Sequence, residues 1–416
     1  MKNMIKRVIP VTLAVSLAAT PVLAYAAEEK LGPGKPYPTD VMVKLEDNVM
    51  EYHEIEMLID TYNTSLKNLR ERYADSKHAM EDIEAVKEQI EDGSDQLSDA
   101  ADQLAALAKS MESMIGYEIP AMGVSVVPSA YAELVYNSVV LENQSHQLLL
   151  SADQLTEMTP EMMRIQMVDS PRAMMIGGAQ SLLIAYENIC LQKGSLLDAI
   201  ALAEAGVQTT ERLAAVGMGT AADVNSAKQG LSAAKAGLIT LEANEVNIRQ
   251  QLCNMLGWAY DASPEIPAIP SVDLTRVDAM NLETDTQTAI NNNFTLKYNR
   301  LSEDTLTNGS VQMENLLRTM KAQEAEIATS MAKLYSAVLQ ARNEYFNAQT
   351  TYGIEQVNMA AAERKFSLGM LSKMEYLQVQ NTYKSAGTNV RVAELTLLQA
   401  IETYDWAVKG SLTVSQ

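Results

Sequence analysis

The stretch that decides the fold reads ERLAAVGMGTAAD over residues 211–223, and it returns as ERKFSLGMLSKME over residues 363–375. Both copies place a glycine, Gly217 or Gly369, directly after a long helical run. Glycine adopts the left-handed conformation that ends a helix at little cost. A Ser/Thr-x-x-Asp/Glu pattern follows, and such a capping box satisfies the free amides of the next helix. Each copy is therefore predicted to be a helix-turn-helix whose two helices pack antiparallel.

Long helices are predicted on both sides of these turns. One covers 171–216 before the first turn, and the next runs from the capping box at Thr220 to Leu256-Gly257. Around the second turn, one helix runs from the turn at 308–310 to Leu368 and the other from Ser372 to Lys409. In the helix after Gly217 the apolar residues alternate steps of three and four, which is coiled-coil spacing and predicts a seam against a neighbouring helix. We therefore expect an all-α fold of two tandem pseudo-repeats, each a long antiparallel coiled-coil hairpin.

A second repeated segment sets the boundaries of the two halves. The sequence NTSLKNLR at 63–70 returns as NFTLKYNR at 293–300. The first repeat is expected over 44–257, where it carries a helical extension and a loop at 115–128. A proline-rich linker follows at 258–275, then the second repeat at 276–410 and a tail at 411–416. In the second half, a helix from Leu282 is expected to turn at 308–310. In the extension, Gly93-Ser94 is a predicted weak point of the helix.

The N-terminus reads as an export signal. Three basic residues precede an apolar run at 8–23, and Ala24-Tyr25-Ala26 supplies a small-x-small cleavage site, so residues 1–26 are a predicted signal peptide. Residues 27–43 are an extended leader rich in Pro and Gly. The formal net charge of −21 weighs against nucleic acid as a partner. The sequence therefore predicts a protein of the cell envelope, in the outer membrane, the periplasm or at the cell surface.

Residues that could carry chemistry are few. The histidines, His53, His78 and His146, are scattered, and no catalytic pair or phosphate-binding glycine loop has a meaningful spacing. We expect no enzyme, no cofactor and no metal site. The two cysteines, Cys190 and Cys253, are expected on the two helices of the first hairpin, at positions about two helical turns apart along its axis. This separation favours buried thiols over a disulfide, although the disulfide stays open.

This arrangement resembles the TolC-like outer-membrane efflux family across nearly the whole mature chain. The family's turn signature is matched by Gly217, Thr220, Asp223-Val224, Ala227 and Leu231, and its opening motif by Ala289 through Leu296 with Phe294 in place of a proline. The resemblance implies a homotrimer in which each chain donates two hairpins to a helical tube. The hairpin tips would contact a periplasmic adaptor (membrane-fusion) protein that works with an inner-membrane transporter. The tip residues carried over are Gly217, Met218, Thr220, Asp223, Gly369, Met370, Ser372 and Glu375.

The sequence departs from this family at the end that would meet the membrane. Family members anchor through two strand hairpins per chain, whereas the second half here has an Asn-Gly turn at 308–309. The first half has at most one short strand in the 115–128 loop, so a variant with little or no β-barrel is expected. The apolar residues of that loop are candidates for envelope contact: Tyr117, Ile119, Val124, Val126 and Val127.

Two functions remain open from the sequence. The first is a TolC-like efflux or export duct. The second is an exported, non-conducting coiled-coil scaffold or interaction protein of the envelope that keeps the same hairpins.

Overall fold

The computed structural model describes residues 37, 39–78, 83–112, 129–152, 159–304, 306 and 309–414. The expected signal peptide, most of the expected leader and the candidate loop residues Tyr117, Ile119, Val124, Val126 and Val127 lie outside this part of the chain. Within it, every regular element is helical, and one isolated parallel bridge joins Val49 to Glu265. The expected all-α fold is confirmed.

The helices run in the following order along the chain: α1 Thr39–Leu45, η3 Tyr52–Glu54, α2 Ile55–Tyr62, α3 Thr64–His78, α4 Ile83–Glu112, α5 Ser129–Ala152, α6 Pro160–Arg164, η4 Ile165–Asp169, α7 Ser170–Ala215, α8 Ala221–Leu256, α9 Thr275–Ala279, α10 Leu282–Asn292, α11 Phe294–Glu303, α12 Val311–Ser367, α13 Lys373–Trp406 and η5 Ala407–Ser411.

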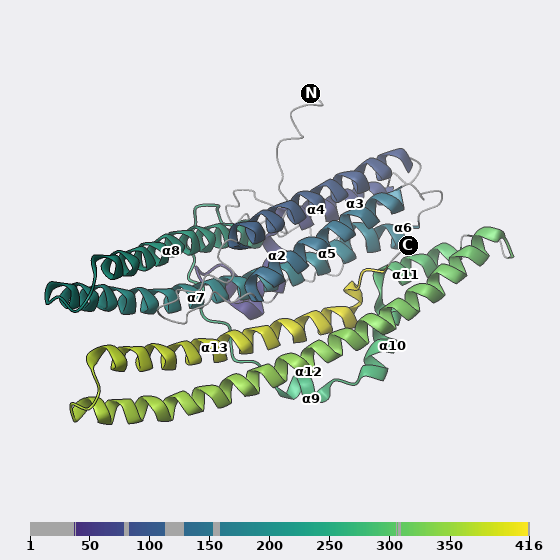
Figure 1. Cartoon of the computed structure of the whole chain (residues 1–416). Coiled ribbons are helices and arrows are strands. Elements are labelled where there is room, and N and C mark those ends of the chain that lie inside the picture. The colour runs from purple at the N-terminus through teal and green to yellow at the C-terminus, as the bar shows by residue number, and fades with distance from the viewer. Residues whose placement is uncertain are drawn as a thin grey trace.

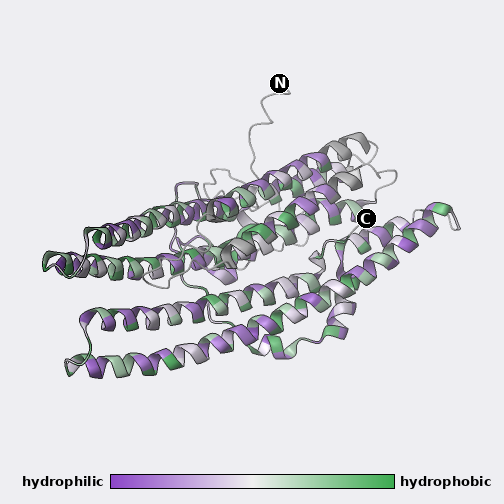
Figure 2. Cartoon of the chain, viewed as in Figure 1, coloured by the Kyte–Doolittle hydropathy of each residue, from purple (hydrophilic) through white to green (hydrophobic). Residues whose placement is uncertain are grey.

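Two long antiparallel hairpins dominate the molecule, one built from α7 and α8 and the other from α12 and α13 (Figure 1). The hairpins lie side by side because α7 packs against α13, and their turns point to the same end. The four helices therefore form one row in the order α8, α7, α13, α12. Figure 2 shows polar and apolar residues mixed along all four. No helix in the described ranges has an apolar run long enough to cross a bilayer.

The extra segment of the first half forms a third hairpin, α4 with α5, that packs beside α3 and the start of α7. The sequence prediction of a weak point at Gly93-Ser94 is wrong, since α4 continues through both residues. Ser94 is buried, and its hydroxyl donates a 2.7 Å hydrogen bond to the carbonyl of Ser145 on α5. This bond satisfies the serine inside the hairpin, so it does not interrupt the helix.

The linker between the halves is held by its backbone. The carboxylate of Glu187 on α7 accepts a 2.7 Å bond from the amide of Ile269 and a 2.6 Å bond from Arg391 on α13. The guanidinium of Arg391 also donates to the carbonyl of Ile269, and Glu394 accepts from the amide of Val272. One Glu-Arg pair thus ties the linker to both hairpins at once.

Two buried asparagines fasten the ends of the hairpins opposite the turns. Asn63 accepts a 2.8 Å bond from the amide of Leu66 at the start of α3 and donates one of 2.8 Å to the carbonyl of Met255 at the end of α8. Asn293 does the same in the second half: it caps Leu296 at 3.1 Å and donates to the carbonyl of Leu412 at 2.7 Å. Its cap also splits the helix expected from Leu282 into α10 and α11.

Replacing either Asn63 or Asn293 with alanine is expected to lower the free energy of unfolding by about 2 kcal/mol. The reason is that each change leaves a buried amide and a buried carbonyl without partners. Urea denaturation followed by circular dichroism measures this loss. The matched control is Asn343→Ala on the exposed face of α12, where a change within about 0.5 kcal/mol is expected. An equal effect at all three positions would contradict this role.

Candidate functional site at the hairpin turns

The first turn is closed by backbone hydrogen bonds around Gly217, whose φ is +78°. The amide of Met218 donates to the carbonyl of Leu213 at 2.8 Å, and the amide of Gly217 donates to that of Ala214 at 3.1 Å. This pair of bonds is a Schellman motif, which satisfies the last carbonyls of a helix when the following residue is left-handed. The positive φ explains why glycine stands at this position.

The second turn repeats this geometry. Gly369 has a φ of +71°, the amide of Met370 donates to the carbonyl of Lys365 at 2.8 Å, and the amide of Gly369 donates to that of Phe366 at 2.9 Å. An added Cβ would meet nothing within 4 Å at either Gly217 or Gly369. The requirement for glycine is therefore one of backbone conformation and not of space.

Capping boxes open the returning helices α8 and α13. The hydroxyl of Thr220 accepts from the amide of Asp223 at 3.2 Å, and the carboxylate of Asp223 accepts from the amide of Thr220 at 2.8 Å. Ser372 and Glu375 make the same reciprocal pair at 3.2 and 2.9 Å. The hydrogen bonds from Thr220 and Ser372 lower the pKa values of Asp223 and Glu375. Both carboxylates are consequently charged beside the helix N-termini.

Apolar side chains project from both turns into solvent. Met218 is 77% exposed and Met370 is 73% exposed, although each is a large hydrophobic residue. Val216 and Leu368, one residue before each glycine, are exposed to a similar degree. The sequence analysis named the two methionines but not Val216 and Leu368. The apolar residue directly before each turn glycine is the feature of the sequence that could have indicated this second pair.

Side-chain pairs close to each turn hold the two helices of each hairpin together as far as the turn. In the first hairpin Lys228 contacts Glu211 at 2.8 Å. In the second, the rings of Phe366 and Tyr376 stack with their centroids 4.5 Å apart. The turns are therefore capped, braced ends of long rods, and all eight predicted tip residues lie at one end of the molecule (Figure 1).

Solved structures similar to this chain are outer-membrane channels. The outer-membrane channel OprN aligns with a TM-score of 0.43 and 14% identity, covering 97% of this chain and 99% of OprN. The CmeC outer membrane channel of Campylobacter jejuni aligns with a TM-score of 0.38 and 12% identity, covering 98% and 96% of the two chains. The outer membrane protein VceC of Vibrio cholerae gives a TM-score of 0.42 at 10% identity, over 68% and 76%. No family model matches the sequence, and no curated protein does.

The identities of 10–14% speak to the fold alone.

Substituting valine at Gly217 or Gly369 is expected to destabilise the protein by about 1–2 kcal/mol, because a β-branched residue must then adopt a positive φ. The control is Gly230→Ala within α8, where an added Cβ meets nothing within 4 Å and the backbone is helical. That change is expected to stabilise by about 0.5–1 kcal/mol, because glycine is a poor helix former. Chemical denaturation measures both. Stabilisation by valine at either turn would show that the glycine conformation is not required.

Proposed function

We propose that the chain is a subunit of a TolC-like efflux or export duct of the cell envelope. Three copies would close into a helical tube, and the two turns of each copy would dock a periplasmic adaptor protein that works with an inner-membrane transporter. The observation that carries this proposal is the open row of four helices. Toward the turns no other helix of the described residues lies beside α8 or α12, whereas farther from the turns α2 contacts α8, and α10 and α11 contact α12 (Figure 1).

The outer helices of the row expose apolar residues. Ile239 on α8 is 68% exposed and Ile354 on α12 is 57% exposed, and Val246 and Val357 on the same two helices are exposed as well. Coiled-coil helices bury such residues against a partner helix. Because α8 and α12 lie at opposite edges, the α8 edge of one copy can pack against the α12 edge of the next. Repetition of this contact closes a ring.

Contacts across the row place Ile239 and Ile354 at a similar height above the turns. Near Ile239, Lys235 of α8 contacts Glu204 of α7 at 2.7 Å. Asp198 of α7 contacts Lys384 of α13 at 2.6 Å. Tyr383, next to Lys384, stacks on Tyr352 of α12, two residues from Ile354. The two exposed isoleucines are therefore suitable partners in a contact between copies.

The double variant Ile239→Cys/Ile354→Cys is expected to form covalent trimers with a short bismaleimide, since a ring brings these two positions of neighbouring copies together. Denaturing electrophoresis measures the product. Each single variant serves as a control and should stay largely monomeric on the gel. If the double variant cross-links no better than the single variants, the edge contact is wrong.

The exposed turns are the part of this row that suits a second protein. Met218 and Met370 are flexible, polarisable side chains, a type often used at adaptable binding surfaces. They stand on rigid helices beside charged residues, so the docking surface is small and apolar at its centre, with the acidic caps Asp223 and Glu375 and basic residues of the last helical turns at its rim. Such a surface fits the end of another helical hairpin protein.

A photo-cross-linking amino acid at Met218 or Met370, introduced in the native host, is expected to capture an adaptor protein encoded with an inner-membrane transporter. Mass spectrometry identifies the captured partner. The control position is Val311, which is 74% exposed but begins α12 at the opposite end from the turns. Capture of the same partner at Val311, or of no adaptor at either methionine, would favour the non-conducting scaffold instead.

A further inference from the structure

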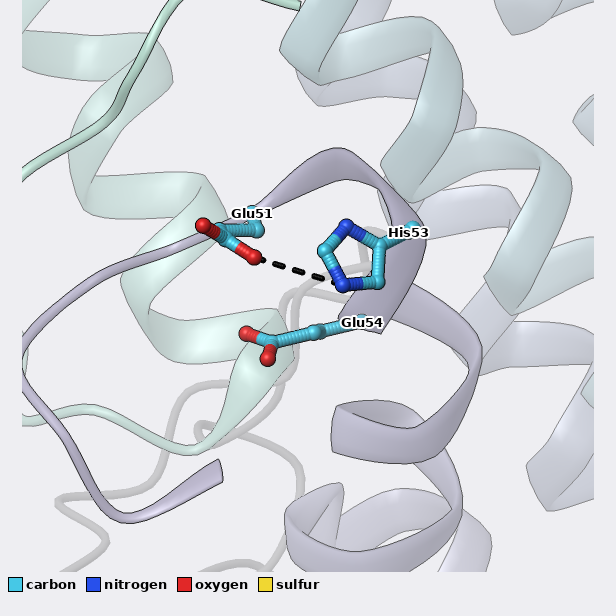
Figure 3. Close-up of side chains that lie close together, drawn as sticks. All are labelled: Glu51, His53 and Glu54. Carbon is cyan, nitrogen blue, oxygen red and sulfur yellow. Dashed lines mark ion pairs between the residues drawn. The ribbon is translucent and has the colours of Figure 1, made fainter. Parts of the chain in front are cut away.

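A cluster of metal-binding side chains lies outside the hairpins, on the short helix η3. Glu51, His53 and Glu54 each offer one ligand atom, and these three atoms all lie within 4.8 Å of one another. The Nε2 atom of His53 is 3.3 Å from the Oε2 atom of Glu51. Figure 3 shows the three side chains turned toward one another around η3.

The local backbone brings these groups together. Glu51 is extended, with φ −91° and ψ 144°, and the amide of Glu54 then bonds to the carbonyl of Glu51 at 3.1 Å. The segment before Glu51 is fixed to the linker, since the amide of Met50 donates to the carbonyl of Glu265 at 2.8 Å. The amide of Glu265 in turn donates to the carbonyl of Asn48 at 2.9 Å. The cluster is therefore held on a backbone that is anchored to the linker on its N-terminal side and continues directly into α2.

Glu54 is the independent sign that something binds here. The residue is only 3% exposed, and no hydrogen bond or ion pair to its carboxylate is found among the described residues, although its oxygen atoms are not among the side-chain atoms that are fully closed off from solvent without a partner. A buried carboxylate without a partner is costly, because water no longer solvates its charge. A cation seated between the three groups would remove this cost.

We propose that Glu51, His53 and Glu54 bind a divalent transition-metal cation of the Zn²⁺ type. One imidazole nitrogen with two carboxylate oxygens is a donor set that suits Zn²⁺, whereas Mg²⁺ and Ca²⁺ prefer oxygen alone. Zn²⁺ holds such ligands at about 2.0–2.2 Å, which puts neighbouring ligand atoms of a tetrahedron about 3.3–3.5 Å apart. The separation of His53 and Glu51 already has this value.

The exposure of the cluster defines what kind of site it is. The side chains of His53 and Glu51 are 63% and 44% exposed, whereas Glu54 is buried, so a bound ion would sit at the surface with a fourth position open to water or to another ligand. Because all three ligands lie on residues 51–54, the ion would stiffen this segment, which the neighbouring bridge from Val49 to Glu265 joins to the linker. This proposal departs from the sequence analysis, which predicted no metal site.

Isothermal titration of the untagged full-length protein with ZnCl₂ in a non-chelating buffer tests this site. One saturable site per chain is expected, together with a rise in the melting temperature, because an ion that binds only the folded state stabilises it. His53→Ala is expected to weaken binding at least tenfold while the circular dichroism spectrum is unchanged, since this side chain is on the surface. The matched control is His146→Ala, which removes another exposed histidine, on α5, and should bind as the wild type does.

Glu54→Gln and a Mg²⁺ titration complete the test. Glutamine keeps the shape of the buried side chain and removes its charge, so Zn²⁺ binding should weaken while the fold persists. Mg²⁺ should bind at least tenfold more weakly than Zn²⁺ if the imidazole is a ligand. The proposal is overturned if the wild type shows no saturable Zn²⁺ site, if His53→Ala and His146→Ala bind alike, or if Mg²⁺ binds as tightly as Zn²⁺.

Discussion

The architecture depends on where four long helices are allowed to stop, and each of them stops at a glycine with positive φ. Gly217 and Gly369 end α7 and α12 at the turns, while Gly257 follows α8 and Gly410 lies just after α13. At the turns the constraint is conformational, since an added Cβ would meet nothing. At the opposite end it is also steric: a Cβ on Gly257 would lie 2.4 Å from Tyr62, and one on Gly410 would lie 2.2 Å from the carbonyl oxygen of Asn292. Helix length and helix pairing are thus fixed at both ends of each hairpin.

The close approach at Gly257 and Gly410 makes the asparagine contacts possible. Tyr62 and Asn292 directly precede Asn63 and Asn293, whose amide groups bind the last carbonyls of the returning chain. Each half is therefore closed by one turn at the exposed end and by one buried asparagine at the other. Between these ends the helices pack through apolar seams, with buried Ile248 and Leu252 in the first half and Ile327 and Ile401 in the second. A rod closed in this way presents its tip without help from a partner.

Much of this could be read from the sequence because the decisive signals are local. A glycine after a helical run and a capping box three residues later are properties of a few neighbouring residues, and both turns form where they were predicted. The sequence reveals the repeated segments that contain the two asparagines, but it does not predict their hydrogen bonds. Asn63 meets Met255 only after the hairpin has folded. The position of the α4–α5 hairpin, beside α3 and the start of α7, depends in the same way on tertiary packing. At the turns, Met218 and Met370 were named from the resemblance, whereas the exposure of Val216 and Leu368 required the structure.

The proposed duct requires the two edges of the row, α8 of one copy and α12 of the next, to meet in a closed, hollow assembly. Electron cryo-microscopy of the purified protein tests it most directly. We expect a hollow ring of helices in which α8 of one copy lies beside α12 of the next, with both turns of every copy at one end. A monomeric particle, or an assembly packed around a closed apolar axis, would contradict it and leave the hairpins as a scaffold.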